Sequence, residues 1–419
     1  MCKPAQFRHS PACCNSQNTS RSHKQLPPRS KGVGFIVYDE NPPALSRGIF
    51  ICNKRNTLKE MALPLLREIT VPRTAAAYSL RWHSRVYAII GLAVFLLAVI
   101  LIASAIGSTK ISFITICQIF LDRLPFVTIE PTWASSVETI IMDIRLPRIL
   151  LAGLVGAALA VAGATYQGLF RNPLADPRLI GVAQGAGLGA VIGFLLPRSL
   201  QIVSIPLLAF IGAVAAVSVV YSIAKVGKTL PMTTLILAGV ALGAFLDAIT
   251  SYFLIASGDR LHAIISWLLG TFSITNWWQV TMVLPYIIVG IAVIWLYARP
   301  LNVMQLDEEQ AKQLGINVEQ TKLILLTAAT LITAAAVSFC GIIGFVGLIV
   351  PHAVRIIWGP DHRFLLPLST FAGASFLILA DTAARTILAP TEIPVGAITA
   401  FVGAPFFLYL LRQKKRAIF

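Results

Sequence analysis

The sequence predicts an all-α membrane protein that crosses the lipid bilayer many times. Of its 419 residues, 56% are hydrophobic and only 12% are charged, and its mean hydropathy is +0.77. A soluble chain of this length would need far more charge to cover its surface. Long stretches without charge recur from residue 86 onward, and about 20 such residues form a helix that spans the hydrocarbon.

The N-terminal part, residues 1–80, differs from everything that follows. It is polar, basic and rich in Pro, Ser, Arg and Cys, without sustained periodicity. Two interpretations stand: a disordered tail, or a spurious extension that precedes a true start at Met61. We expect a single transmembrane domain over residues 81–419.

Ten spans follow from the charge-free runs. The run 323–354 is too long for one crossing and contains Gly341, Gly344 and Gly347. We therefore expect two helices there, joined by a tight outer turn. The other eight spans are expected at residues 86–108, 149–170, 179–196, 203–224, 232–255, 281–298, 364–384 and 394–411.

The net charge of +16 is interpreted as loop charge rather than as a nucleic-acid surface. Basic residues gather in the cytoplasmic loops of membrane proteins. With ten spans, the more basic loops, including those with Arg171, Lys225 and Lys312, share a side with both termini. The sequence therefore predicts cytoplasmic termini and no nucleic-acid partner. The six cysteines contain no pair at zinc-ligand spacing, so we expect no metal site and no cofactor.

The second span and the segment after it organise the predicted bundle. Gly153, Gly156, Ala160 and Gly163 are spaced three and four apart, which puts them on one helix face where another helix can approach closely. A polar hinge over residues 171–177 follows, and a second glycine-rich run starts after it. We expect this second span to lie in the interior, packed against other helices.

The loop 302–320 is the one extended amphipathic segment on the predicted inner side. Asp307 and Gln310 can form a capping box, and acidic residues suit the positive start of a helix. Gly315 lies just after that helix, where a left-handed conformation is wanted. We expect a short helix and a glycine break, which together form a rigid knob that docks on a partner. The alternative is an ordinary solvated loop.

The spans contain few polar residues that could couple transport to an ion gradient. An ion-coupled transporter needs intramembrane carboxylates, and the spans contain only Asp247 and Asp381. Asp381 lies four residues before Arg385, so we expect an intrahelical ion pair to be its main role. The predicted spans contain no nucleophile and base at a spacing typical of an enzyme. So few carboxylates make an ion-coupled secondary transporter the less favoured alternative, but they do not exclude it.

The sequence resembles the permease subunits of ATP-binding-cassette (ABC) importers for iron chelates (siderophores and haem) and vitamin B12. The matching motifs run in family order over roughly four-fifths of the chain, and residues 1–80 have no counterpart. The motifs are RLPR (145–148), GLFRNPLADP (168–177), LAGVAL (237–242), LDEEQAKQLGI (306–316), GFVGLIVPHAVR (344–355), DHRFLLP (361–367), LADTAAR (379–385) and EIPVGAITAFVGAPFF (392–407).

The resemblance implies the type II ABC importer permease fold with ten transmembrane helices, and it implies several partners. A cytoplasmic ATPase would dock on each permease, and a periplasmic or lipid-anchored binding protein would dock outside. A second permease copy, most simply a homodimer, would complete the pathway in the bacterial inner membrane. The cargo would be an iron chelate, either a ferric siderophore or haem, with vitamin B12 as the alternative. The chain itself would not be an enzyme.

The same resemblance implies roles for particular residues. The binding protein would be met by Arg145, Arg148 and Arg385; arginines suit this role because they form bidentate pairs with carboxylates. Each could instead be a snorkelling anchor. The segment that couples to the ATPase would consist of Leu306, Asp307, Glu308, Ala311, Leu314 and Gly315. The inner gate would consist of Asn172, Leu174, Met232 and Thr233.

Overall fold

The structure is a computed structural model that describes residues 75–107, 111–123, 133–273 and 275–416. The expectation of a polar extension over residues 1–80 therefore falls almost entirely outside the described residues. Within the described part every element is a helix, and the only extended pairing is an isolated bridge between Val226 and Thr229. The all-α prediction agrees with this architecture.

Seven helices of the described residues are long and apolar enough to cross a membrane, which confirms a multi-pass protein. Their spanning segments lie in α2 (Ala75–Ala105), α5 (Leu146–Leu169), α7 (Arg198–Ala224), α8 (Met232–Ala256), α10 (Trp277–Leu296), α13 (Val318–Cys340) and α15 (His362–Thr386). Shorter apolar helices are α3 (Phe113–Asp122), α6 (Val182–Leu195), α14 (Val346–Trp358) and the apolar part of α16 (Val395–Arg416).

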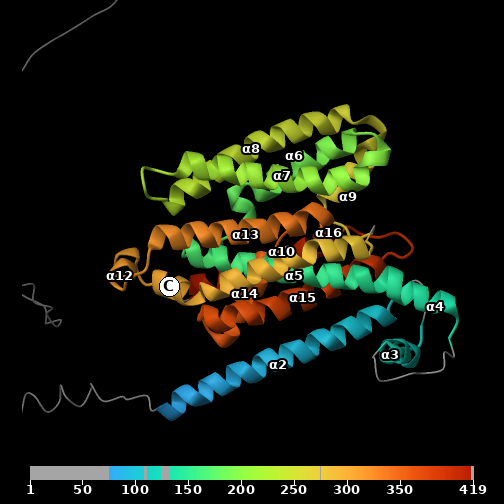
Figure 1. Cartoon of the computed structure of the whole chain (residues 1–419), viewed down its shortest axis with the longest axis horizontal. Helices are drawn as coiled ribbons and strands as arrows, with labels where there is room; N and C mark the ends of the chain where they lie inside the picture. The colour runs from blue at the N-terminus through green and yellow to red at the C-terminus, as the bar shows by residue number, and fades with distance from the viewer. Residues whose placement is uncertain (1–74, 108–110, 124–132, 274, 417–419) are drawn as a thin grey trace, which may run out of the picture. The chain divides into compact units, whose positions relative to one another are not determined.

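Helix α5 occupies the interior. It continues directly from α4 (Ser135–Thr139) and a π-helical segment, η1 (Ile140–Arg145). In its most apolar stretch 89% of the residues are buried, against 11% for α2. Helices α13, α14 and α15 all contact it, and Figure 1 shows it between α13 and α15. The predicted central position of this span is confirmed.

Glycine allows these helices to approach α5 so closely. A Cβ placed on Gly163 would overlap the backbone carbonyl of Gly347 in α14. A Cβ on Gly156 would overlap the carbonyl of Gly373 in α15. Side chains at these crossings would hold the helix axes farther apart, so small residues here shorten the interhelical distance.

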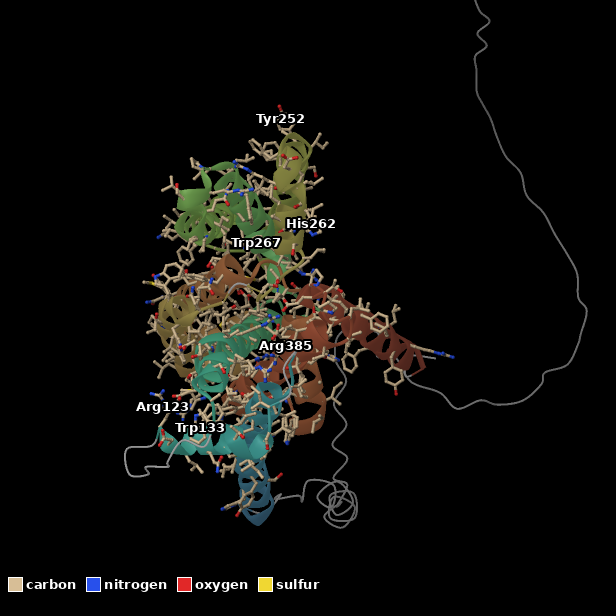
Figure 2. All side chains as sticks on the ribbon, turned by 90° about the vertical axis from the view of Figure 1, so that its right-hand side faces the viewer. Arg123, Trp133, Tyr252, His262, Trp267 and Arg385 are labelled. Atoms are coloured by element: carbon tan, nitrogen blue, oxygen red, sulfur yellow. The ribbon has the colours of Figure 1, made fainter. Side chains whose placement is uncertain are left out.

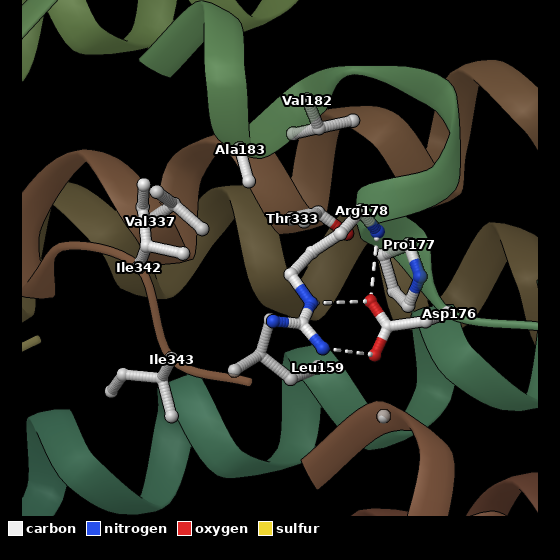
Figure 3. A pocket seen from close by; sticks show the side chains of 11 residues that line it. Leu159, Asp176, Pro177, Arg178, Val182, Ala183, Thr333, Val337, Ile342 and Ile343 are labelled. Atoms are coloured by element: carbon white, nitrogen blue, oxygen red, sulfur yellow. Dashed lines mark hydrogen bonds and ion pairs between the residues drawn. The ribbon is translucent and has the colours of Figure 1, made fainter. Parts of the chain in front are cut away.

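The polar hinge after α5 leads into a compact turn. Asp176 caps the 3₁₀ turn η2 (Pro177–Ile180) by accepting a hydrogen bond from the Arg178 backbone N–H at 2.8 Å. The Arg178 guanidinium returns to the same carboxylate, with an Nε–Oδ1 distance of 3.0 Å, as Figure 3 shows. Helices α6 and α7 then form a tight pair, because a Cβ on Gly185 would overlap the carbonyl of Gly212.

The long apolar run 323–354 contains two helices, as predicted. Helix α13 ends at Cys340, residues 341–345 form the turn, and α14 starts at Val346. Gly341 has a φ of 77°, a conformation that is easy only for glycine. The backbone N–H of Thr271 donates to the Cys340 carbonyl at 2.8 Å, which fixes the turn against a neighbouring loop.

Several short helical segments were not predicted from the sequence, among them α3, α4, η1 and α9 (Leu261–Leu268). None of these four contains a charge-free run of spanning length. Helix α9 is amphipathic: Ile264 and Trp267 are buried, whereas Leu261 and Ile265 are exposed.

Candidate functional site: two polar clusters at the ends of α5

Charged side chains gather at both ends of the central helix. We name the first group the arginine cluster; it consists of Arg145, Arg148, Arg385, Asp381 and Glu392. We name the second group the α12 network; it consists of Arg171, Glu308, Glu319 and Lys322. The first surrounds the start of α5, and the second begins two residues beyond its last residue, Leu169. At 1.5 Å per residue, the helix separates them by about 35 Å.

Arg148 is the centre of the arginine cluster. Its Nη2 lies 2.8 Å from Oδ1 of Asp381, and its Nη1 lies 2.9 Å from Oε1 of Glu392. Ser273 donates its hydroxyl to Glu392 at 2.7 Å. The side chain of Asp381 is 1% exposed, so the Arg148–Asp381 pair is buried on the carboxylate side. This pair joins α5 to α15.

The other two arginines connect to α2. Arg145 donates to the Ser104 carbonyl at 2.7 Å, and Arg385 donates to the Ala103 carbonyl at 2.6 Å. Figure 2 shows Arg385 within a dense group of nitrogen-bearing side chains. The three predicted docking arginines therefore do lie together, as the resemblance implies. All three are mostly buried, with side chains of Arg148 and Arg385 only 11% and 8% exposed.

The expected pairing of Asp381 needs a correction. Its distance to Arg385 Nε is 3.8 Å, longer than its 2.8 Å contact with Arg148. The intrahelical contact is therefore the weaker of the two. Arg148 and Asp381 are 233 positions apart in the chain, and no local pattern signals such a pair. Glu392 was missed for the same reason.

Glu392 lies outside the spanning helices, and its surroundings favour the carboxylate. Partial burial acts to raise its pKa, but the hydrogen bonds from Arg148 and Ser273, together with the charges of Arg148 and Arg385, lower the pKa below its usual value. The cluster therefore holds three cations and two anions at neutral pH, a formal excess of one positive charge.

At the other end, α12 (Glu308–Gln313) has the features expected of a docking knob. Asp307 caps it, although the carboxylate accepts from the Glu308 N–H at 2.7 Å, so the bond expected at Gln310 is corrected. Gly315 has a φ of 80°, the left-handed conformation that was predicted. Leu306 and Leu314 are 72% and 68% exposed, whereas Ala311 is fully buried. Two exposed leucines thus flank a helix that is anchored by Ala311.

The α12 network ties this helix to two other segments. Lys322, whose side chain is 4% exposed, donates from Nζ to Glu308 at 2.8 Å and to Glu319 at 3.1 Å. Glu319 accepts the backbone N–H of Leu230 at 2.8 Å. Arg171 Nη1 lies 3.9 Å from Oδ1 of Asp307, and its Nη2 lies 3.9 Å from Oε1 of Glu308. Helix α12 is therefore linked to the hinge after α5 and to the segment before α8.

The four predicted gate residues lie directly beside these links. Asn172 and Leu174 are in the hinge, where Asn172 Oδ1 accepts the Leu174 N–H at 3.0 Å. Met232 and Thr233 are the first two residues of α8, just after Leu230. Among the described residues, no side-chain hydrogen bond joins the two pairs to each other. Their connection runs through Arg171, Glu308, Lys322 and Glu319.

This arrangement defines a class of protein: a helical multi-pass membrane protein in which ion pairs and hydrogen bonds link a short exposed helix, α12, to the hinge after α5 and to the segment before α8. Comparison with known proteins identifies the family. Residues 95–413 match the model of the FecCD transport family, and the chain belongs to it. It is thus a permease subunit of an ABC importer and is not itself a catalyst. Permeases of this kind work with ATPase and binding-protein partners.

Several relatives are described by what they import. The chain is 42% identical to a cobalamin import system permease protein of Halobacterium salinarum, over 82% of this chain and 99% of that protein. It is 43% identical to a hemin transport system permease protein of Yersinia pestis, over 66% of this chain and 84% of the relative. It also resembles a solved ABC transporter described as metal-chelate type and inward-facing, with a TM-score of 0.68 and 29% identity over 78% of this chain and 98% of the other.

Proposed function

We propose that the chain imports an iron chelate, a ferric siderophore or haem, through a pathway that a partner ATPase opens and closes. Relatives said to transport hemin and ferric citrate support this cargo. A second candidate is a cobalamin, supported by the 42% identity that extends over 99% of the cobalamin permease. All these cargoes are metal ions held in organic ligands.

We propose ten spans over residues 81–419, with both termini in the cytoplasm. The seven long helices account for seven crossings, and α6, α14 and α16 supply three more. Each of these three contains an apolar stretch of 10–17 residues. An even number of crossings puts both ends on one side. Under this topology α12 and the hinge after α5 face the cytoplasm, and the arginine cluster faces outward.

The observation that carries the proposal is the α12 network. The exposed knob presents two outward leucines, Leu306 and Leu314, which a partner protein could cover. Ion pairs connect that knob to the hinge after α5 and, through Glu319, to the start of α8. When the ATPases draw the two knobs together, the network transmits the displacement to Asn172, Leu174, Met232 and Thr233. This is how nucleotide binding would drive alternating access.

We propose that the arginine cluster receives the binding protein. Because Arg145, Arg148 and Arg385 are bonded within the chain, they offer a field of excess positive charge rather than free side chains. Such a field attracts acidic residues and orients the encounter. The same bonds hold α2, α5 and α15 together, so docking there acts directly on the central helix.

A second permease copy is supported by Asp247. It is exposed on α8, and its carboxylate forms no hydrogen bond or ion pair with the described residues. A carboxylate facing lipid at this depth is costly. A second copy, or the aqueous pathway between two copies, would remove that cost. We therefore propose a homodimer with α8 on its inner side.

The decisive experiment is uptake into proteoliposomes. The permease is reconstituted with its ATPase and binding protein, and ⁵⁵Fe-siderophore, haem and cobalamin are offered separately. We expect ATP-dependent accumulation of an iron chelate, and none without the ATPase. Cobalamin uptake alone would favour the second candidate. Accumulation by the permease alone, abolished in Asp247→Asn, would instead identify an ion-coupled transporter.

A further inference from the structure

A groove runs along the surface between α7 and α13. Its α7 wall consists of Val214, Val217, Ser218, Tyr221 and Ser222, and its α13 wall consists of Leu323, Leu326, Thr327, Thr330 and Leu331. Both sets have the spacing i, i+3, i+4, i+7, i+8, which places each on one helix face. The cavity between them has a volume of about 280 Å³. It is mostly apolar, with hydroxyl groups along its length.

A second cavity of about 300 Å³, lined in part by charged and amide side chains, adjoins the groove. The two share Tyr221 and Leu323, so they lie next to each other. Lys225 and Lys228 line the second cavity from a tight turn after α7, in which Thr229 N–H donates to the Val226 carbonyl at 3.0 Å. Asn317 and Gln320 line it from the start of α13.

The two lysines have no carboxylate partner among the described residues. Lys225 lies over the Tyr221 ring, with Nζ 5.7 Å from its centre, and neither lysine is in an ion pair of the described chain. Glu319 also lines this cavity, but its oxygens already accept from Lys322 Nζ and Leu230 N–H. The cavity therefore presents two uncompensated ammonium groups with amide and hydroxyl donors around them.

We propose that this composite cavity binds one anionic glycerophospholipid. Its phosphate would lie between the ammonium groups of Lys225 and Lys228, and Asn317 and Gln320 would donate to the headgroup. One acyl chain would follow the apolar groove past Tyr221. A basic pocket that adjoins an apolar groove on a membrane-spanning bundle fits a headgroup with its tail attached. Free phosphate would use only the cavity lined by Lys225 and Lys228.

The position of the site connects it to the α12 network. Leu230 and Glu319 line the lipid headgroup cavity, and they are also the two residues joined by the 2.8 Å hydrogen bond before α8. A lipid that fills the cavity would hold the 225–230 turn in place. We therefore expect the bound lipid to steady the link between α12 and the start of α8.

Native mass spectrometry of the purified full-length protein tests this proposal. The protein is exchanged into nanodiscs of phosphatidylglycerol or phosphatidylcholine and then released. We expect one retained phosphatidylglycerol, and about fivefold less retention for each of Lys225→Gln and Lys228→Gln, as for lysines near an anionic headgroup. Arg299→Gln is the matched control, because Arg299 is an exposed basic residue of α11 (Ala298–Met304) outside the cavity. It should retain lipid normally.

Two further arms separate the sources of phosphate and the other occupants. Ser218→Trp fills the groove from an exposed position and should lower lipid retention while leaving the lysines in place. Millimolar inorganic phosphate should not displace the lipid. Displacement by phosphate, equal retention of phosphatidylcholine, or unchanged retention in the double lysine variant would overturn the proposal. Disulfide-linked dimers of Ser218→Cys would assign the groove to a second copy instead. These readouts measure binding only, so they are independent of the proposed import.

Discussion

Lys322 reaches back 14 positions along the chain to bond Glu308, with Nζ and Oε2 2.8 Å apart. Because the lysine is buried at the start of α13, the bond anchors the exposed helix α12 to a spanning helix of the bundle. A force applied to α12 by another protein would therefore be carried into α13 instead of bending a loop.

Replacing Lys322 by Met should uncouple the transporter. Glu308 and Glu319 would lose their shared cation, and the Leu230 carbonyl would lose a donor, at a cost of about 1–3 kcal/mol in stability. We expect the complex with the ATPase to assemble and hydrolyse ATP, while uptake in proteoliposomes falls at least about tenfold. Lys322→Arg should restore part of the uptake, and Arg299→Gln should leave it unchanged. Loss of ATPase assembly in Lys322→Met would contradict this role.

Gly315 provides a second test of α12. An L-residue at its φ of 80° costs about 1–2 kcal/mol, and proline cannot adopt it at all. We expect Gly315→Ala to weaken coupling and Gly315→Pro to abolish it, with the protein still inserted. Gly258→Ala is the control, since Gly258 also has a positive φ and open space at its Cβ. Uptake at the wild-type rate in Gly315→Pro would argue against docking through this helix.

The Arg148–Glu392 pair predicts a dependence of stability on pH. The pKa of Glu392 is lower in the folded protein than its ordinary value, so the carboxylate stabilises the fold above the ordinary pKa of about 4.3. That contribution disappears as the pH falls through the lowered value. In thermal unfolding in detergent, the Tm of the wild type should be higher than that of Glu392→Gln at pH 7. This difference in Tm should shrink below about pH 4. A constant difference would mean that the pair is not responsible.

The α5–α14 crossing predicts a difference between a glycine at a close helix contact and a glycine with open space around it. Gly163→Ala would push into the Gly347 backbone and should destabilise the protein by about 1–3 kcal/mol, as overpacking does. Gly91 has nothing within 4 Å of its Cβ, so Gly91→Ala should be neutral or stabilise α2 by up to about 1 kcal/mol. Thermal unfolding of the two purified variants measures this. Equal effects would show that the crossing is looser than the structure has it.

Much of this fold could be read from charge-free runs, since lipid permits few alternatives to a helix. The division of residues 323–354 into α13 and α14 needed only length and Gly341. Helices α3 and α9 were not predicted because they are too short to span the membrane and depend on packing against the rest of the bundle. Their ends do not coincide with the ends of a long charge-free run.

The site was predictable only where its chemistry is local. The cap at Asp307 and the glycine at position 315 are neighbours in sequence, so α12 could be anticipated. The pairs Arg148–Asp381 and Lys322–Glu308 join residues brought together by the fold, and each partner alone is an ordinary charged residue. The resemblance pointed to the three arginines of the arginine cluster, but neither their burial nor the contacts of Arg148 with Asp381 and Glu392 could be predicted.

Gly156 and Gly373 have a consequence for how any motion is distributed. Each lies against the main chain of the opposite helix, so the spacing of α5 and α15 is set by peptide groups instead of side chains that can change rotamer. The distance between these two helices can therefore change very little. We therefore expect α5 and α15 to move as one unit during a transport cycle. The helices that move relative to them should be those whose contacts consist of flexible side chains.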